Sequence, residues 1–142
     1  MKWYLGILGL LFGLLLSCHA SQGSQTFSET TQSNQDTIRI ANEELEYEII
    51  IFDPGFNSWL MSYARPRGYH SQTYLENRNR VWVQEWNIRA NTPTRYGNLF
   101  EMRIEYDFNT NYGYEVNYML YNYLVYYQLK YNIKLGGFAP RI

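Results

Sequence analysis

The chain has 142 residues, with 12 Lys and Arg against 13 Asp and Glu and a formal net charge of −1. This length allows one domain, and the balanced charge lacks the basic excess typical of nucleic-acid-binding proteins, so we predict no nucleic-acid partner. A single Cys excludes an internal disulfide and a Cys-based zinc cluster, and two His are too few for a His-rich metal site. We therefore predict neither a metal ion nor a cofactor.

The N-terminal residues have the pattern of a secretory leader. Lys2 precedes the uncharged apolar run Trp3–Leu16, which as a helix would span roughly 21 Å, less than the ~30 Å hydrocarbon core of a bilayer. The run ends in Leu15-Leu16-Ser17-Cys18, which resembles the lipobox of bacterial lipoproteins. The resemblance implies a signal peptide over residues 1–17, cleavage before Cys18, and acylation of the Cys18 thiol and of the new amine.

An ordinary cleaved signal peptide with a chance Cys is the alternative. We favour lipidation because the only Cys falls at the end of the only apolar leader, where two or three acyl chains would anchor the protein stably to a membrane. Residues 18–36 then form a lipidated, flexible tether, because a stretch rich in Ser, Gln, Thr and Asn buries too little apolar surface to fold. His19 in place of Asp implies, by the same resemblance, an outer-membrane protein, and we expect it to face the periplasm.

The folded domain is expected over residues 37–142, and it begins with a predicted strand. Tyr47 and Ile49 alternate with Glu46 and Glu48, and the following residues up to Phe52 are continuously apolar, a pattern typical of a strand that becomes buried at its end. Asp53-Pro54 then predicts the start of a helix, and Pro66-Arg67-Gly68 predicts its end after about three turns.

A second helix is predicted from Ser71, a good capping residue, to about Asn91. Apolar residues alternate with charged ones from Phe100 to Phe108, which predicts a strand with one buried face. The stretch from Tyr114 to Tyr131 has no Pro or Gly and is too long for one ordinary strand. We predict a long, mostly buried helix there, with a strand within residues 126–135 as the alternative.

The predicted order is β-α-α-β-α, an α+β domain in which a small antiparallel sheet packs against three helices. A sheet of two strands is marginal in water. We therefore expect this sheet to recruit either Thr37–Ala41 or a strand of a partner chain.

Charge is segregated along the chain. Residues 29–53 carry seven acids with Arg39 alone, whereas residues 65–95 carry six Arg against Glu76 and Glu85. Mutual neutralisation within the fold is the simplest interpretation. The functional alternative is an anion-binding patch, because Arg pairs bidentately with carboxylates and phosphates. The candidate ligand-binding residues are Arg65, Arg67, His70, Tyr74, Arg78 and Trp82.

Sequence motifs for catalysis are missing. The chain contains no Gly-rich phosphate loop, no H-E-x-x-H and no G-x-S-x-G. His70 is the sole His of the predicted domain, and its place between Tyr69 and Ser71 just before a helix is typical of a cap or loop residue. We therefore name no catalytic residue.

Three stretches resemble a known family: FDPGFNSWLMSYARPRGYHSQTYLENRNRVWVQEWN, RYGNLFEMRIEYDF and YGYEVNYMLYNYLVYYQLKYN. With the leader and tether, they resemble small Bacteroidota lipoproteins described only as a domain of unknown function, over about residues 45–135. The resemblance implies an envelope location but no activity and no binding residues.

Our first hypothesis is a non-enzymatic, lipid-anchored envelope protein that acts through contacts with another envelope protein. The second is a binding module for an anionic glycan, lipid headgroup or peptide, through the Arg and aromatic residues named above. A hydrolase built on His70 is the third.

Overall fold

A computed structural model describes residues 37–42 and 47–142 of the chain, so the leader, Cys18, the tether and residues 43–46 lie outside the described residues. The elements follow one another as β1 (Thr37–Asn42), β2 (Tyr47–Phe52), α1 (Pro54–Tyr63), α2 (Gln72–Ala90), α3 (Pro93–Tyr96), the short 3₁₀ helix η2 (Gly97–Phe100) and α4 (Gly113–Lys130). None of the described helices is long and apolar enough to cross a membrane.

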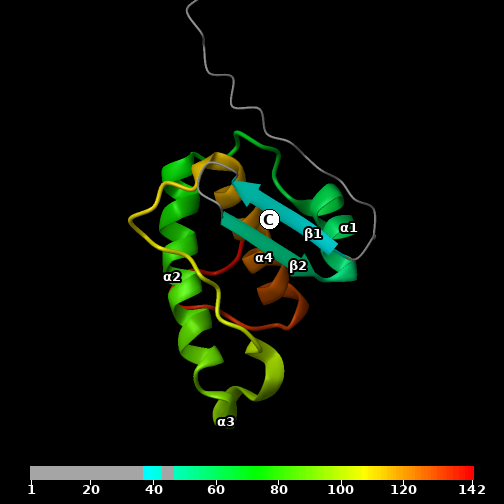
Figure 1. Cartoon of the computed structure of the whole chain (residues 1–142). Coiled ribbons are helices and arrows are strands. Elements are labelled where there is room, and N and C mark those ends of the chain that lie inside the picture. Colours follow the sequence, from blue (N-terminus) through cyan, green and yellow to red (C-terminus); the bar gives the residue numbers. More distant parts are fainter. Residues whose placement is uncertain (1–36, 43–46) are drawn as a thin grey trace, which may run out of the picture.

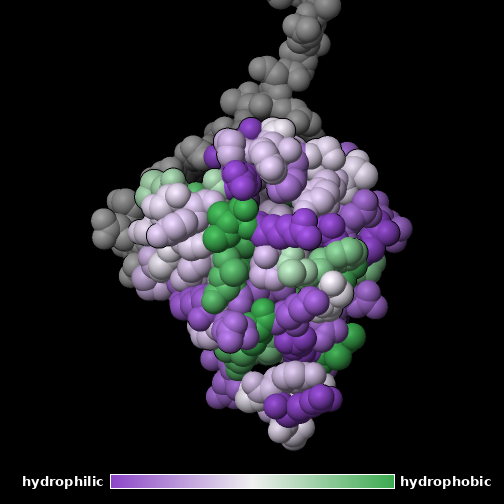
Figure 2. Space-filling model, turned by 180° about the vertical axis from the view of Figure 1, so that it is seen from behind, coloured by the Kyte–Doolittle hydropathy of each residue, from purple (hydrophilic) through white to green (hydrophobic). Residues whose placement is uncertain are grey.

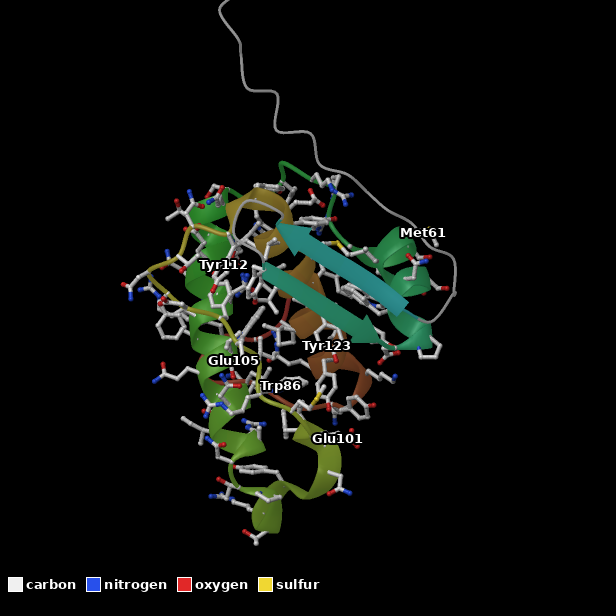
Figure 3. The ribbon with its side chains drawn as sticks, in the orientation of Figure 1. Met61, Trp86, Glu101, Glu105, Tyr112 and Tyr123 are labelled. Atoms are coloured by element: carbon white, nitrogen blue, oxygen red, sulfur yellow. The ribbon has the colours of Figure 1, made fainter. Side chains whose placement is uncertain are left out.

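Helix α4 lies at the centre of the fold, with α2 beside it and the two strands across one of its sides (Figure 1). Twelve of its 18 residues are buried, including Leu120 and Leu124. Burial on most sides of a helix is typical of a position inside the core. Trp86 of α2 approaches Tyr123 of α4, with ring centroids 6.2 Å apart (Figure 3).

The Tyr side chains of α4 belong mainly to this core. A Tyr can bury its ring while its hydroxyl finds a partner at the edge. The Tyr118 hydroxyl donates to the Arg65 carbonyl oxygen at 2.7 Å, and the Tyr127 hydroxyl donates to the Leu99 carbonyl oxygen. Hydrogen bonds from these Tyr hydroxyls therefore join α4 to the loops around it.

The predicted α+β class is wrong, because the body of the protein is built from helices. The β structure in the described residues is one antiparallel pair in which Thr37 lies opposite Phe52. No strand follows Phe52 in the described part of the chain, so the strand predicted between the second and third helices is not formed.

The segment predicted as a strand from Phe100 to Phe108 explains the error. Residues 101–112 are irregular, and side chains of α2 bind their backbone. The Trp86 indole N–H donates to the Met102 carbonyl oxygen at 2.8 Å, while the Asn87 amide donates to the Ile104 carbonyl at 2.9 Å and accepts from the Ile104 N–H at 2.8 Å. These groups need no neighbouring strand, because α2 already satisfies them.

The alternation of apolar and charged residues in this segment still predicts correctly which side chains are buried at some of its positions. Phe100 is buried, and Ile104 and Tyr106 are half-buried. Met102 and Phe108, expected on the same buried face, are instead 74% and 46% exposed.

The three longer helices begin where the sequence predicted. Asp53 caps α1 by accepting the Gly55 N–H at 3.0 Å, and Ser71 caps α2 by accepting the Tyr74 N–H at 3.2 Å. The helix predicted over 114–131 is confirmed as α4. It ends at Lys130, and the left-handed φ of 49° at Asn132 then lets the Ile133 N–H reach the Gln128 carbonyl at 3.0 Å.

Candidate anion-binding site

Four of the six predicted ligand residues lie together at the N-terminal half of α2. His70 precedes Ser71, the cap of α2, and Tyr74 and Arg78 follow one turn apart on the same side of that helix. The His70 ring stacks on the Tyr74 ring, with centroids 4.2 Å apart and an interplanar angle of 10°. The local sequence around a capped helix start thus builds this part of the site.

Helix α4 and the C-terminal segment complete the site. Tyr121 of α4 presents its ring to His70, with centroids 5.4 Å apart, and to Tyr74, with centroids 6.0 Å apart. The Arg65 guanidinium donates to the main-chain oxygen of Ile142 at 3.0 Å. The C-terminal segment, red in Figure 1, passes behind the strands beside α2 and α4. We call the resulting surface the cationic face and define it as Arg65, His70, Tyr74, Arg78 and Tyr121, together with Arg141, whose charge acts on Tyr121.

The guanidinium groups of this surface contact aromatic rings. The Arg65 Cζ lies 5.0 Å from the centroid of the Tyr69 ring. The Arg78 Cζ lies 5.0 Å from the Tyr74 centroid and 3.5 Å from that of Phe138. Such stacking orients a guanidinium while leaving its N–H edges available to an acceptor.

The cationic face is electrostatically unbalanced. Among the described residues, no Asp or Glu side chain forms an ion pair with Arg65, Arg78 or Arg141. Burial and then the positive charges of Arg65 and Arg78 lower the pKa of His70. Burial and the neighbouring Tyr74 raise the pKa of Tyr121, against the opposite effect of Arg78 and Arg141. A bound anion would relieve the repulsion among the cations.

The two remaining predicted residues have supporting roles. Arg67 points to Glu115: its Nη2 lies 2.5 Å from Oε1, and its Nε donates to the two carboxylate oxygens at 2.6 and 2.9 Å. Trp82 is 1% exposed, stacks under Tyr121 with centroids 5.3 Å apart, and donates its indole N–H to the Phe138 carbonyl oxygen at 3.3 Å. The structure therefore does not bring Arg67 and Trp82 to the ligand-facing side of the cluster.

The side opposite the strands carries no broad hydrophobic patch. In Figure 2 strongly hydrophilic residues alternate there with weakly polar ones, and the strongly hydrophobic colour is confined to narrow areas. A surface of this kind favours polar or charged ligands over an apolar partner.

The described residues offer no support for hydrolysis or metal binding. No Ser, Asp or Glu side chain in the described ranges hydrogen-bonds to His70, and the Ser71 hydroxyl is engaged as the cap of α2. In residues 37–42 and 47–142, no group of three or more His, Cys, Asp or Glu could hold a metal ion.

Comparison with known proteins gives one match. The model of a family described as "Family of unknown function (DUF6146)" matches residues 5–140. No curated protein and no solved structure matches the chain. Because the match extends over nearly all of the 142 residues, this chain belongs to DUF6146, a family of unknown function.

Proposed function

We propose that the chain is a lipid-anchored protein of the bacterial envelope whose folded domain binds an anionic partner and catalyses no reaction. The anchor is supported by the lipobox-like Leu15-Leu16-Ser17-Cys18 and by the Ser- and Gln-rich tether that follows it. A Bacteroidota lipoprotein on the periplasmic side of the outer membrane agrees with His19 at the position after Cys18.

One observation carries the binding role: Arg65 and Arg78 contact the aromatic rings around His70, and no Asp or Glu side chain among the described residues pairs with Arg65, Arg78 or Arg141. A phosphate or carboxylate held between two guanidinium groups gains charge-assisted hydrogen bonds, which are about twice as strong as neutral ones. The rings of Tyr69, Tyr74 and Phe138 contact the guanidinium groups of Arg65 and Arg78.

This chemistry fits an acidic glycan, a lipid headgroup or an acidic peptide. A partner protein of the envelope that carries an acidic segment would bind to the same guanidinium groups. The two hypotheses of an envelope protein partner and of an anionic ligand therefore share one surface.

The anchor is tested by mass spectrometry of the protein made in its own host and by fractionation of a Cys18→Ala variant. We expect a mature protein that begins at an acylated Cys18, and a Cys18→Ala variant that leaves the membrane fraction. An unmodified Cys18, or a variant that stays with the membrane, would overturn the anchor.

The binding role is tested with the full chain and sedimentation of phosphatidylglycerol vesicles, with phosphatidylcholine vesicles as the neutral reference. The chain carries the Cys18→Ala substitution in this experiment, so that acyl chains make no contribution. We expect Arg65→Gln with Arg78→Gln to weaken binding to the anionic vesicles at least tenfold. Arg95→Gln removes a positive charge from an exposed site outside the cationic face and should change binding little. Equal binding by all variants would exclude the cationic face.

A further inference from the structure

A second site lies on the other side of α2 from the cationic face. A pocket of about 260 Å³ opens between the N-terminal half of α2 and the loop of residues 106–111. Gln72, Glu76 and Arg80 line it at successive turns of α2, two residues out of phase with Tyr74 and Arg78. In Figure 1 this loop is drawn in yellow and runs along the outer side of α2.

The loop is held in place before any ligand binds. The Gln72 amide donates to the Asn111 side-chain oxygen at 2.7 Å and ties the loop to α2. Asp107 accepts the Asn109 N–H at 2.9 Å, and its own N–H donates to the Tyr112 hydroxyl at 2.9 Å. A pocket whose walls are fixed in this way loses little conformational entropy on binding.

The aromatic wall is anchored to the core. Tyr106 stacks on Tyr112 with centroids 4.9 Å apart, and its hydroxyl donates to the buried side-chain oxygen of Asn117 at 2.6 Å. Burial raises the pKa of Tyr106 to about 12. Tyr106 is therefore a neutral, fixed ring at physiological pH.

The charged groups of the pocket are not paired with one another. Glu76 and Arg80 are one turn apart, yet no ion pair joins them in the described structure. The Glu76 Oε1 accepts from the Gln72 amide at 2.8 Å, and the Arg80 Cζ lies 5.6 Å from the centroid of the Phe108 ring. One acceptor and one donor of opposite charge thus face the pocket, and their charges cancel.

We propose that this pocket binds one neutral hexopyranose ring, either free or at the end of a glycan. Adjacent sugar hydroxyls both donate and accept, which suits the Glu76 carboxylate and the Arg80 guanidinium. The C–H face of a sugar ring is apolar and can pack on the exposed ring of Phe108 or on Tyr106. The volume accommodates one ring, and the balance of charge favours a neutral ligand over the anions that the cationic face would select.

The test uses the full chain in a sugar-free detergent such as lauryldimethylamine oxide. Saturation-transfer NMR and calorimetry are run with glucose, galactose, mannose and N-acetylglucosamine, and with sorbitol as the open-chain reference. We expect at least one pyranose to bind, with saturation concentrated on the C–H protons of one ring face, and sorbitol to bind at least tenfold more weakly. If a methyl glycoside binds as tightly as the parent sugar, the natural ligand is the end of a glycan. If the methyl glycoside does not bind, the natural ligand is a free sugar.

Variants separate this site from the rest of the surface. Glu76→Gln and Phe108→Ala should each weaken sugar binding at least fivefold. We expect little change in the melting temperature, because Gln at position 76 keeps an oxygen that can accept from the Gln72 amide and the Phe108 side chain is 46% exposed. Gln84→Ala, an exposed position one turn beyond Arg80, should leave the affinity unchanged. The proposal is overturned if no pyranose binds up to about 20 mM, if the variants bind like the parent chain, or if a zwitterionic amino acid such as alanine binds in place of the sugars.

Discussion

Lys130, in the last turn of α4, forms an ion pair with Asp53, the residue that caps the first turn of α1, with 2.8 Å between Nζ and Oδ2. The same carboxylate accepts the Tyr126 hydroxyl at 2.8 Å and the Gly55 N–H at 3.0 Å. One side chain therefore starts α1 and joins it to the central helix, over 77 residues of sequence.

Replacing Asp53 with Ala should lower the free energy of unfolding by about 2 kcal/mol, the upper end of the range for the loss of a helix cap. The variant also leaves the Tyr126 hydroxyl without its acceptor. Lys130→Gln should cost less, about 0.5 kcal/mol, because the Lys130 side chain is 38% exposed and solvent screens its charge. Urea denaturation of both variants checks the order, and a larger cost for Lys130→Gln would show that the ion pair outweighs the cap.

Asp53 should also make stability depend on pH in the acid range. Burial alone would raise the pKa of Asp53, but its bonds to Lys130, Tyr126 and Gly55 outweigh this effect and lower the pKa below 3.8. The contribution is therefore fully present above the unfolded-state pKa and is lost as the pH falls through the lower pKa of the folded state. Denaturation curves between about pH 5 and 2 should show a smaller decline for Asp53→Asn than for the parent chain. Parallel declines would assign the acid sensitivity to other carboxylates.

Gly55 and Tyr126 should behave as a coupled pair. A Cβ added at Gly55 would lie 2.5 Å from the Tyr126 hydroxyl oxygen, so Gly55→Ala should displace that hydroxyl from Asp53 and cost about 1–2 kcal/mol. Tyr126→Phe removes the obstacle, and Ala then has a higher helix propensity than Gly. A double-mutant cycle should find the double variant more stable than the sum of the single effects predicts. Simple additivity would exclude the steric coupling.

The side chain of Gln128 should hold the C-terminal segment against α4. It is 1% exposed, and its side-chain oxygen accepts the N–H of the buried Leu135 at 2.7 Å. Gln128→Met keeps a similar volume but leaves that N–H without an acceptor, which should cost about 2 kcal/mol and speed hydrogen exchange at Leu135. Gln84→Met, at an exposed position of α2, should change stability by less than about 0.5 kcal/mol. Unchanged exchange at Leu135 in Gln128→Met would show that the segment is held by other contacts.

The helices could be predicted because their limits are local. Asp53 with Pro54 and Ser71 with Tyr74 carry the chemistry of a helix start within four residues. The long run of α4 could be assigned from its length and its lack of Pro and Gly.

The irregular conformation of residues 101–112 could not be predicted. The alternation of apolar and charged residues indicates which side chains face inward, but it does not indicate which groups form hydrogen bonds with the backbone. Those groups belong to Trp86 and Asn87, which are polar at their tips and occur in a helix. The segment therefore has the sequence of a strand but lies on side chains of α2.

The candidate site likewise contains residues that could be predicted from the sequence and residues that could not. Arg65, His70, Tyr74 and Arg78 are close in sequence and could be grouped from the cap at Ser71 and helical spacing. Tyr121, Phe138 and Arg141 join them only through tertiary contacts, and no spacing in the sequence marks them. The ion pair of Arg67 could not be predicted, because its partner, Glu115, is 48 residues away.

The position of α4 has a consequence for biosynthesis. The ribosome makes α1 and α2 before it makes the helix that covers their apolar sides, and α4 is the last described helix of the chain. Phe56 and Leu75, both fully buried in the finished protein, therefore remain exposed to water until residues near Lys130 have emerged. Apolar surface exposed in this way makes a nascent chain prone to aggregation until α4 has been made.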